Sequence, residues 1–436
     1  MKKLTIDKLL RFSKREFSKI ADKRSSNKSY ELGDILQCGL AIFHLKCPSL
    51  LEFVRMYPER EKSMLQIYKV ENCPKDTQMR EILDEVEPSE LHKIRRKVLM
   101  KLNNGGWLKD YRYLRNRLVV SIDGVHHHSS KDIHCDKCQQ SHHRDGTVTY
   151  KHSMLSAVIV HPDKKVVLPL RDEPIVLQDG KSKNDSELCA VCRLLDGLER
   201  DHPKLKFIIV EDALYANGPH IKRLREKKHD FIIRAKRGSA AGYVFTQYNA
   251  LLKKGKVNVQ ESNDGKVWKV WHYVNDLPLN GANPDVLVNF LHYEERDPRT
   301  GRVLKSFDWI SSIRLSKYTI KKVTKAGRAR WKIENETFNT LKNQGYNYGH
   351  NFGHGHKNLC TVFALLMMMA FLFDQIQQLC CPLFNKAWQK KKAKRRLWDA
   401  IRVCFKSLPF RSMEQIYKAI IYGYTVKGIV IKEDSR

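Results

Sequence analysis

Two short apolar runs, each ending in an aspartate, place the strongest constraint on how this chain can fold. Residues 118–124 read LVVSIDG, so β-branched residues crowd a short run that stops at a glycine after Asp123. Residues 207–212 read FIIVED, and a breaker at residues 217–219 follows Asp212. Short apolar runs bounded by turn residues are typical of buried central strands. We therefore predict that both aspartates lie where a core strand ends.

The elements around these two strands predict a known topology. Alternating residues 147–160 and apolar residues 165–170, joined by a turn, complete a three-strand meander with the first run. A helix follows, because apolar residues recur there at helical spacing: Leu188, Val191, Leu194, Leu195 and Leu198. The strand that ends in Asp212, a helix over residues 221–228 and a strand over residues 230–234 come next. This order, followed by a late helix, is found in ribonuclease H-like cores, so we predict an α/β fold of this class.

A third carboxylate lies in the late helical segment. Residues 326–342 have a helix-forming composition and contain the run RARWKIENE, which starts at Arg328. Arg330 precedes Glu334 by one helical turn, so the guanidinium and the carboxylate share a face. Taken singly, a strand-terminal Asp is often a turn residue, and such a Glu is usually a solvated partner of its Arg. Three acids in this order favour a common site.

The chain resembles the DDE transposases of bacterial insertion sequences, in the class whose core carries a β-rich insertion before the final glutamate. The resemblance covers residues 76–356. In that class the glutamate helix carries a tyrosine, an arginine, the glutamate and a lysine at fixed spacing, and Arg330 and Glu334 match two of these. The resemblance implies an enzyme that binds the terminal inverted repeats of its own element, cleaves phosphodiester bonds at the ends and joins the 3′-hydroxyls to target DNA.

Two positions depart from the pattern of that class. The tyrosine position holds Gly327, and the lysine position, seven residues after the glutamate, holds Leu341. The nearest lysine is Lys342. In a regular α-helix of about 100° per residue, an eighth residue lies roughly 80° away from the face of Glu334.

The resemblance also implies roles for the three acids. Asp123, Asp212 and Glu334 are expected to hold two Mg²⁺ or Mn²⁺ ions, which activate the attacking oxygen and stabilise the leaving one. Arg330 and Lys342 are expected to contact DNA phosphates. Glu211 is an alternative to Asp212. Alternation along a strand puts the two side chains on opposite faces, and the residues alone do not say which face holds the metals. The resemblance places the catalytic acid at Asp212.

Residues 237–311 interrupt the core pattern with short alternating runs and turn signals, which are typical of a β-rich insertion. The insertion ends in an aromatic stretch that includes Trp309. An aromatic ring near the glutamate helix is suited to stack on a base extruded at the element end, so Trp309 is the candidate for that contact. The alternative is a tryptophan in the core of the insertion.

A second metal site is indicated just after Asp123. Cys135 and Cys138 form a Cys-x₂-Cys pair, and His142 and His143 follow closely. Thiolates and imidazoles at such spacing predict a structural Zn²⁺ site, with a fourth ligand among His126, His127, His128 and His152. The alternative is an exposed histidine-rich loop with reduced thiols.

The charge of the chain agrees with a double-stranded DNA partner. The 80 Lys and Arg against 48 Asp and Glu give a formal charge of +32, which suits repeated phosphate contacts. We expect an N-terminal helical region for DNA binding or dimerisation (1–115), a catalytic core (116–345) and a basic helical C-terminal region (346–436). Synapsis of two element ends implies a homodimer.

The cysteines and the hydropathy of the chain bear on its compartment. Eleven cysteines without regular spacing predict a reducing cytoplasm, here that of a bacterium, in association with the nucleoid. The apolar stretch over residues 360–373 is shorter than a membrane span and predicts a buried helix, with no membrane partner.

Two other functions stay open. A ribonuclease H-like nuclease without strand transfer would use the same acids. A catalytically silent DNA-binding protein descended from a transposase is favoured by Gly327 and Leu341, whereas the three acids and Arg330 favour an active enzyme.

Overall fold

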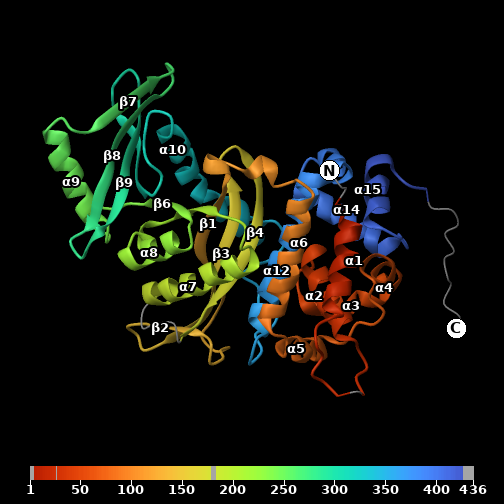
Figure 1. Ribbon diagram of the computed structural model, residues 1–436. Helices are drawn as coiled ribbons and strands as arrows, with labels where there is room; N and C mark the ends of the chain where they lie inside the picture. Colours follow the sequence, from red (N-terminus) through yellow and green to blue (C-terminus); the bar gives the residue numbers. More distant parts are fainter. Residues whose placement is uncertain (1–3, 26, 178–182, 426–436) are drawn as a thin grey trace, which may run out of the picture. The chain divides into compact units, whose positions relative to one another are not determined.

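The computed structural model describes residues 4–25, 27–177 and 183–425 (Figure 1). Within these residues the chain forms two compact units. The first comprises Glu87–Lys342 and Tyr348–Leu365. The second comprises the chain up to Val86, Asn343–Asn347, and the chain from Leu366 onward.

The first unit is built on one ten-stranded sheet. Its strands are β1 (Leu118–Ser130), β2 (Gln139–His142), β3 (Val148–His161), β4 (Lys164–Ile175), β5 (Phe207–Glu211), β6 (Asp230–Arg234), β7 (Asn258–Asn263), β8 (Trp268–Asn280), β9 (Asn283–Arg296) and β10 (Val303–Ser311). The strand order is β2-β3-β1-β5-β6-β10-β9-β8-β7, and β4 pairs with β3. Strand β1 is antiparallel to β3 and parallel to β5, which is parallel to β6. The predicted α/β fold with a ribonuclease H-like core is confirmed.

The helices of the first unit cover this sheet. They are α6 (Pro88–Asn104), α7 (Lys183–Asp201), α8 (Gly218–Glu226), α9 (Gly242–Lys253), α10 (Ile320–Arg328) and α11 (Asn339–Asn343). All residues of β5, and those of β1 from Leu118 to Ile122, are buried. Strands covered on both faces read as continuous apolar runs, which is why these two runs were recognisable.

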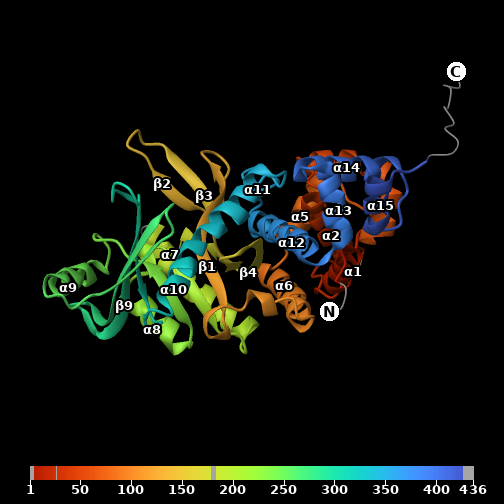
Figure 2. The same ribbon diagram turned by 90° about the horizontal axis from the view of Figure 1, so that it is seen from above.

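Side-chain alternation along β1 shows which helix covers which face. The Ser121 hydroxyl donates to the carbonyl oxygen of Arg330 (3.1 Å), so the segment from α10 to α11 lies on the face of Ser121. Figure 2 shows this segment crossing beside β1. Gly124 points to the opposite face, where a Cβ would lie 3.2 Å from the carboxylate of Glu187 on α7.

The insertion before the glutamate segment is rich in strands, as the sequence predicts. Strands β7 to β10 are antiparallel, and β10 pairs with β6, with Trp309 opposite Arg234. The insertion therefore extends the core sheet, and Figure 1 shows α9 beside its strands. The indole nitrogen of Trp271 donates to Thr324 of α10 (3.0 Å), which attaches the insertion to the glutamate segment.

The second unit is helical. Its helices are α1 (Ile6–Phe17), α2 (Leu32–His44), α3 (Leu50–Arg55), α4 (Tyr57–Ser63), α5 (Asp76–Asp84), α13 (Pro382–Lys391), α14 (Lys394–Ser407) and α15 (Met413–Tyr422). Residues of α12 (Leu359–Cys380) belong to both units. This helix is long and apolar enough to cross a membrane, and its whole apolar window is buried. It continues past the expected apolar stretch, and the carboxylate of Asp374 lies 2.6 Å from the ammonium of Lys46.

Candidate active site

The register of two parallel strands brings the two aspartates to one level. Ser121 of β1 lies opposite Val210 of β5. Continued by two residues, this register sets Asp123 level with Asp212, which directly follows β5. Because side chains alternate, both aspartates point to the face of Ser121, over which the glutamate segment lies.

Glu211 points the other way. It is buried, and its carboxylate lies 2.8 Å from Nε2 of His220 on α8. Asp212 is partly exposed, and its carboxylate accepts a hydrogen bond from the amide of Leu214 (2.9 Å) at the start of a short 3₁₀ turn. The geometry thus supports Asp212 rather than Glu211 as the acid of the site.

Arg330 joins the first acid to the last. Its guanidinium lies 2.9 Å from a carboxylate oxygen of Asp123 and 3.0 Å from one of Glu334. The three residues come from β1 and from the turns that follow α10: a 3₁₀ turn, Ala329–Trp331, and a π-helical turn, Ile333–Phe338. Arginine offers a planar fork of donors, so one guanidinium can hold two carboxylates in fixed positions.

Negative charge is concentrated at this point. The pKa of Asp123 is raised to about 7 as the net result of burial, which raises it, the Arg330 guanidinium, which lowers it, and the carboxylate of Glu334, which raises it. A divalent cation beside Asp123 would favour its ionised form. The carboxylates of Asp123, Asp212 and Glu334 supply only oxygen donors, which suit hard ions such as Mg²⁺ and Mn²⁺. These residues therefore fit such an ion, which would be held by the carboxylates of Asp123, Asp212 and Glu334.

The π-helical turn changes the position of the lysine. Leu341, seven residues after Glu334, is fully buried, whereas Lys342 is exposed. A π-helical turn contains about one residue more than an α-helical turn, and Ile333–Phe338 forms such a turn. Two turns from Glu334 therefore take eight residues here, whereas about seven suffice in a regular α-helix. The expected displacement of roughly 80° applies only to a regular α-helix. Lys342 therefore returns to the face of Glu334.

Trp309 does not lie where a base could stack. Its side chain is 2% exposed, stacked on Phe307 with a ring-centroid distance of 5.4 Å. A Cβ added to Gly327 would lie 2.7 Å from the Trp309 indole, so the indole fills the space that a tyrosine at position 327 would need. The structure thus favours the alternative for Trp309, a tryptophan in the core of the insertion, over contact with an extruded base.

The structure adds two residues that sequence reasoning missed. Glu187 on α7 lies against Gly124, next to Asp123. Burial raises the pKa of Tyr215, and the charges of Glu187, Glu211, Asp212 and Asp123 raise it further. A single glutamate in an amphipathic helix carries no sequence signal. Trp331 is 49% exposed, with the Arg330 guanidinium 4.8 Å from its ring centre. In the sequence, only the position of Trp331 next to Arg330 indicated that it lies near the site.

The His and Cys residues after Asp123 gather differently from the prediction. Cys135 and Cys138 lie with His152 and His354, and neither His142 nor His143 belongs to this group. The reason is the hairpin register. Gln139 of β2 pairs with Lys151 of β3, which sets Cys138 beside His152 and carries His142 toward the hairpin tip.

One comparison with known proteins assigns the chain to a family. The model of the family described as "Transposase DDE domain" matches residues 115–372. Among solved structures, the chain is similar to a piggyBac transposase in a synaptic complex with hairpin DNA. The two chains are 10% identical, the alignment covers 97% of this chain and 83% of that chain, and the TM-score is 0.41. No curated protein matches the chain. The family assignment rests on the domain match alone.

Proposed function

Because the chain belongs to the DDE transposase family, we propose that it binds the terminal inverted repeats of its own mobile element, cleaves phosphodiester bonds there and joins the 3′-hydroxyls to target DNA. Its action as a DNA transposase follows from the family. The proposal concerns the reaction steps, the residues that carry them and an origin in a bacterial insertion sequence.

One observation carries the proposal. Asp123 and Glu334 are held by a single guanidinium, that of Arg330, while the strand register sets Asp212 level with Asp123 on the same face. The three acids come from β1, from the residue after β5 and from the glutamate segment, so the packing of the core fixes their relative positions. A site of this kind matches the acids that give the family its name.

We assign the metal site to Asp123, Asp212 and Glu334. Two Mg²⁺ or Mn²⁺ ions would supply activation of the attacking oxygen and stabilisation of the leaving oxygen. Arg330, placed between two of the acids, orients both carboxylates and is positioned to contact a phosphate.

The DNA backbone would follow the exposed side of the glutamate segment. The π-helical turn places Lys342 toward the face of Glu334 by its residue count, and Lys321, Lys322 and Lys325 are exposed on α10. Their charges suit phosphate contacts with release of counterions. Trp331, exposed next to Arg330, replaces Trp309 as the aromatic side chain suited to stack on an unpaired base.

Further expectations belong to the same proposal. The helical N-terminal region would take part in DNA binding or dimerisation, and two subunits would hold the two element ends. A cytoplasmic, nucleoid-associated enzyme is consistent with the formal charge of +32. Of the two departures that favour a silent protein, the one at Leu341 is offset by Lys342, because the π-turn restores a lysine to the face of Glu334.

The test uses purified full-length protein, DNA that carries the ends of the surrounding element, and either Mg²⁺ or Mn²⁺. Cleavage at the ends followed by joining to a target plasmid is the expected result. Cleavage with no joining would instead show a nuclease. Binding of the ends with no cleavage under either ion would show a silent DNA-binding protein.

A further inference from the structure

We propose that Cys135, Cys138, His152 and His354 bind one structural Zn²⁺ ion, which fastens the β2–β3 hairpin to the segment that follows the glutamate helix. All four residues lie in the first unit. The inference is independent of the transposase reaction, because none of the four residues belongs to the acidic site.

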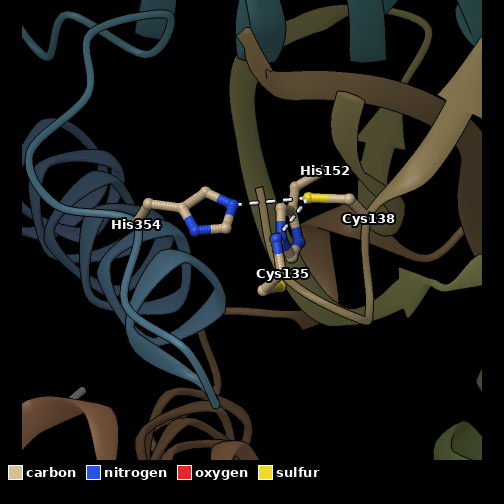
Figure 3. Close-up of side chains that lie close together, drawn as sticks. All are labelled: Cys135, Cys138, His152 and His354. Atoms are coloured by element: carbon tan, nitrogen blue, oxygen red, sulfur yellow. Dashed lines mark hydrogen bonds between the residues drawn. The ribbon is translucent and has the colours of Figure 1, made fainter. Parts of the chain in front are cut away.

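The four side chains converge, as Figure 3 shows. One ligand atom from each residue lies within 4.8 Å of all the others. Sγ of Cys135 is 3.3 Å from Nε2 of His152, and Sγ of Cys138 is 3.4 Å from Nε2 of His354. In a tetrahedral site with Zn–S of about 2.3 Å and Zn–N of about 2.0 Å, sulfur and nitrogen lie about 3.5 Å apart. The observed separations are thus close to those of a metal centre.

The backbone explains why these residues meet. Both sulfurs come from one turn, in which the amide of Cys138 donates to the carbonyl oxygen of Cys135 (3.0 Å). The β2–β3 register then sets His152 beside Cys138. His354 arrives from a distant part of the sequence, and the nearby contact between Lys137 and Asn358 (2.8 Å) holds the same two segments together.

The tautomer of His354 suits a ligand. Its Nδ1 lies 2.8 Å from the carbonyl oxygen of Gly355, which can only accept a hydrogen bond, so Nδ1 carries the proton. Nε2 of the neutral ring then presents a lone pair toward Cys138. Metal-bound histidines usually donate their other ring nitrogen to a carbonyl or carboxylate in this way.

The surroundings of the cluster also favour a metal. Cys138, His152 and His354 are buried, although the loop that carries Cys138 is polar and its one large apolar residue, Ile133, is 47% exposed. Apolar burial therefore contributes little to the order of this loop. A Zn²⁺ ion with two thiolate and two imidazole ligands would supply the missing stabilisation.

A competing arrangement shares one ligand. His127, His152 and Cys360 also lie with ligand atoms within 4.8 Å of one another. That set offers one thiolate and two imidazoles, whereas the proposed set offers four ligands and the spacing of a Cys-x₂-Cys turn. Cys360→Ser separates the two arrangements, because only the competing one needs its sulfur.

The consequence of the proposed ion lies in its position along the chain. The segment with His354 follows α11, which follows Glu334, while His152 lies on β3, the strand that pairs with β1 and its Asp123. The ion would therefore link the part of the first unit that carries Asp123 to the part that carries Glu334. Its removal is expected to loosen the segment around His354 without removing any acid.

The experiment measures the metal content of full-length protein purified without added metal, and then X-ray absorption at the zinc edge. About one zinc per chain, with two sulfurs at about 2.3 Å and two nitrogens at about 2.0 Å, is the expected result. Cys138→Ser and His354→Asn should lose the metal, and His142→Asn, His143→Asn and Cys360→Ser should keep it.

A wild-type measurement avoids dependence on variants that do not fold. Titration of the thiols with a mercurial reagent should release zinc, and Co²⁺ in its place should give the visible absorption of a tetrahedral thiolate site. Zinc-free protein that folds and does not take up Co²⁺ would overturn the proposal. Loss of metal in Cys360→Ser, with retention in Cys138→Ser, would move the site to the competing arrangement.

Discussion

The hydroxyl of Ser121 donates a hydrogen bond of 3.1 Å to the carbonyl oxygen of Arg330. Ser121 is fully buried and lies two residues before Asp123 on the same face of β1. The contact therefore fixes the glutamate segment to the strand that carries the first acid, and core packing sets the distance between Asp123 and Glu334.

Ser121→Ala should weaken this attachment. The carbonyl group of Arg330 would lose its side-chain donor and keep the backbone donor from Lys332, so the expected loss is that of one hydrogen bond, about 1 kcal/mol in the free energy of unfolding. Urea unfolding measures the change. Ser306→Ala, on the exposed part of β10, is the control and should stay within about 0.5 kcal/mol of wild type. Equal stability of the two variants would contradict the role of the contact.

Arg330→Gln should shift the pH dependence of DNA cleavage. The guanidinium lowers the pKa of Asp123, so its removal should raise that pKa and move the acidic limb of the rate profile to higher pH. Cleavage should also fall by about 10²–10³-fold, with partial recovery in Arg330→Lys. The measurement is the rate of Mn²⁺-dependent nicking between pH 6 and 9. Arg314→Gln, in an exposed pair with Asp276, should leave rate and profile unchanged.

Gly327→Ala should strain the core beside the glutamate segment. Its Cβ would lie 2.7 Å from the Trp309 indole, and overpacking of this kind costs about 1–3 kcal/mol. Trp309→Leu should relieve part of that loss in the double variant. Thermal unfolding of the two single variants and the double variant measures the coupling. Gly281→Ala, which meets open space, serves as the control.

Acid should destabilise the fold through buried histidines. Burial lowers the pKa values of His44, His202 and His229 to about 4. The unfolded chain binds a proton at each near pH 6.5, so stability is present above that pH and is lost as the pH falls toward 4. Each residue should contribute a loss of about 2 kcal/mol at pH 5.

Unfolding temperatures between pH 7.5 and 5 check this prediction. His202→Gln should reduce the dependence on pH, and His350→Gln, an exposed position, should leave it unchanged. A wild-type unfolding temperature that is constant over this range would contradict the account.

Sequence patterns predicted the core of the first unit well. The runs that end in Asp123 and Asp212 are buried on both faces, so their apolar composition alone identified strands β1 and β5. Alternation then placed Glu211 opposite to Asp212. The contacts of Arg330 with Ser121 and Asp123 show which face the glutamate segment covers.

Other features depend on contacts that sequence spacing does not carry. Lys342 returns to the face of Glu334 only because a π-turn intervenes, and helical periodicity assumes its absence. His354 is distant in sequence from Cys138, so proximity along the chain pointed to His142 and His143 instead. The indole of Trp309 packs against Gly327, in the space that a side chain at position 327 would fill. The sequence showed this position only as the absence of the expected tyrosine.

The central claim is that Asp123, Asp212 and Glu334 form the metal-dependent active site. The most direct measurement compares Mn²⁺-dependent nicking of element-end DNA by wild type, Asp123→Asn, Asp212→Asn, Glu334→Gln and the neighbouring control Glu336→Gln, each with its unfolding temperature. We predict that each of the first three variants folds, binds the ends and loses nicking by about a thousandfold, while Glu336→Gln stays active. Nicking by a folded Asp212→Asn protein at the wild-type rate would contradict the account.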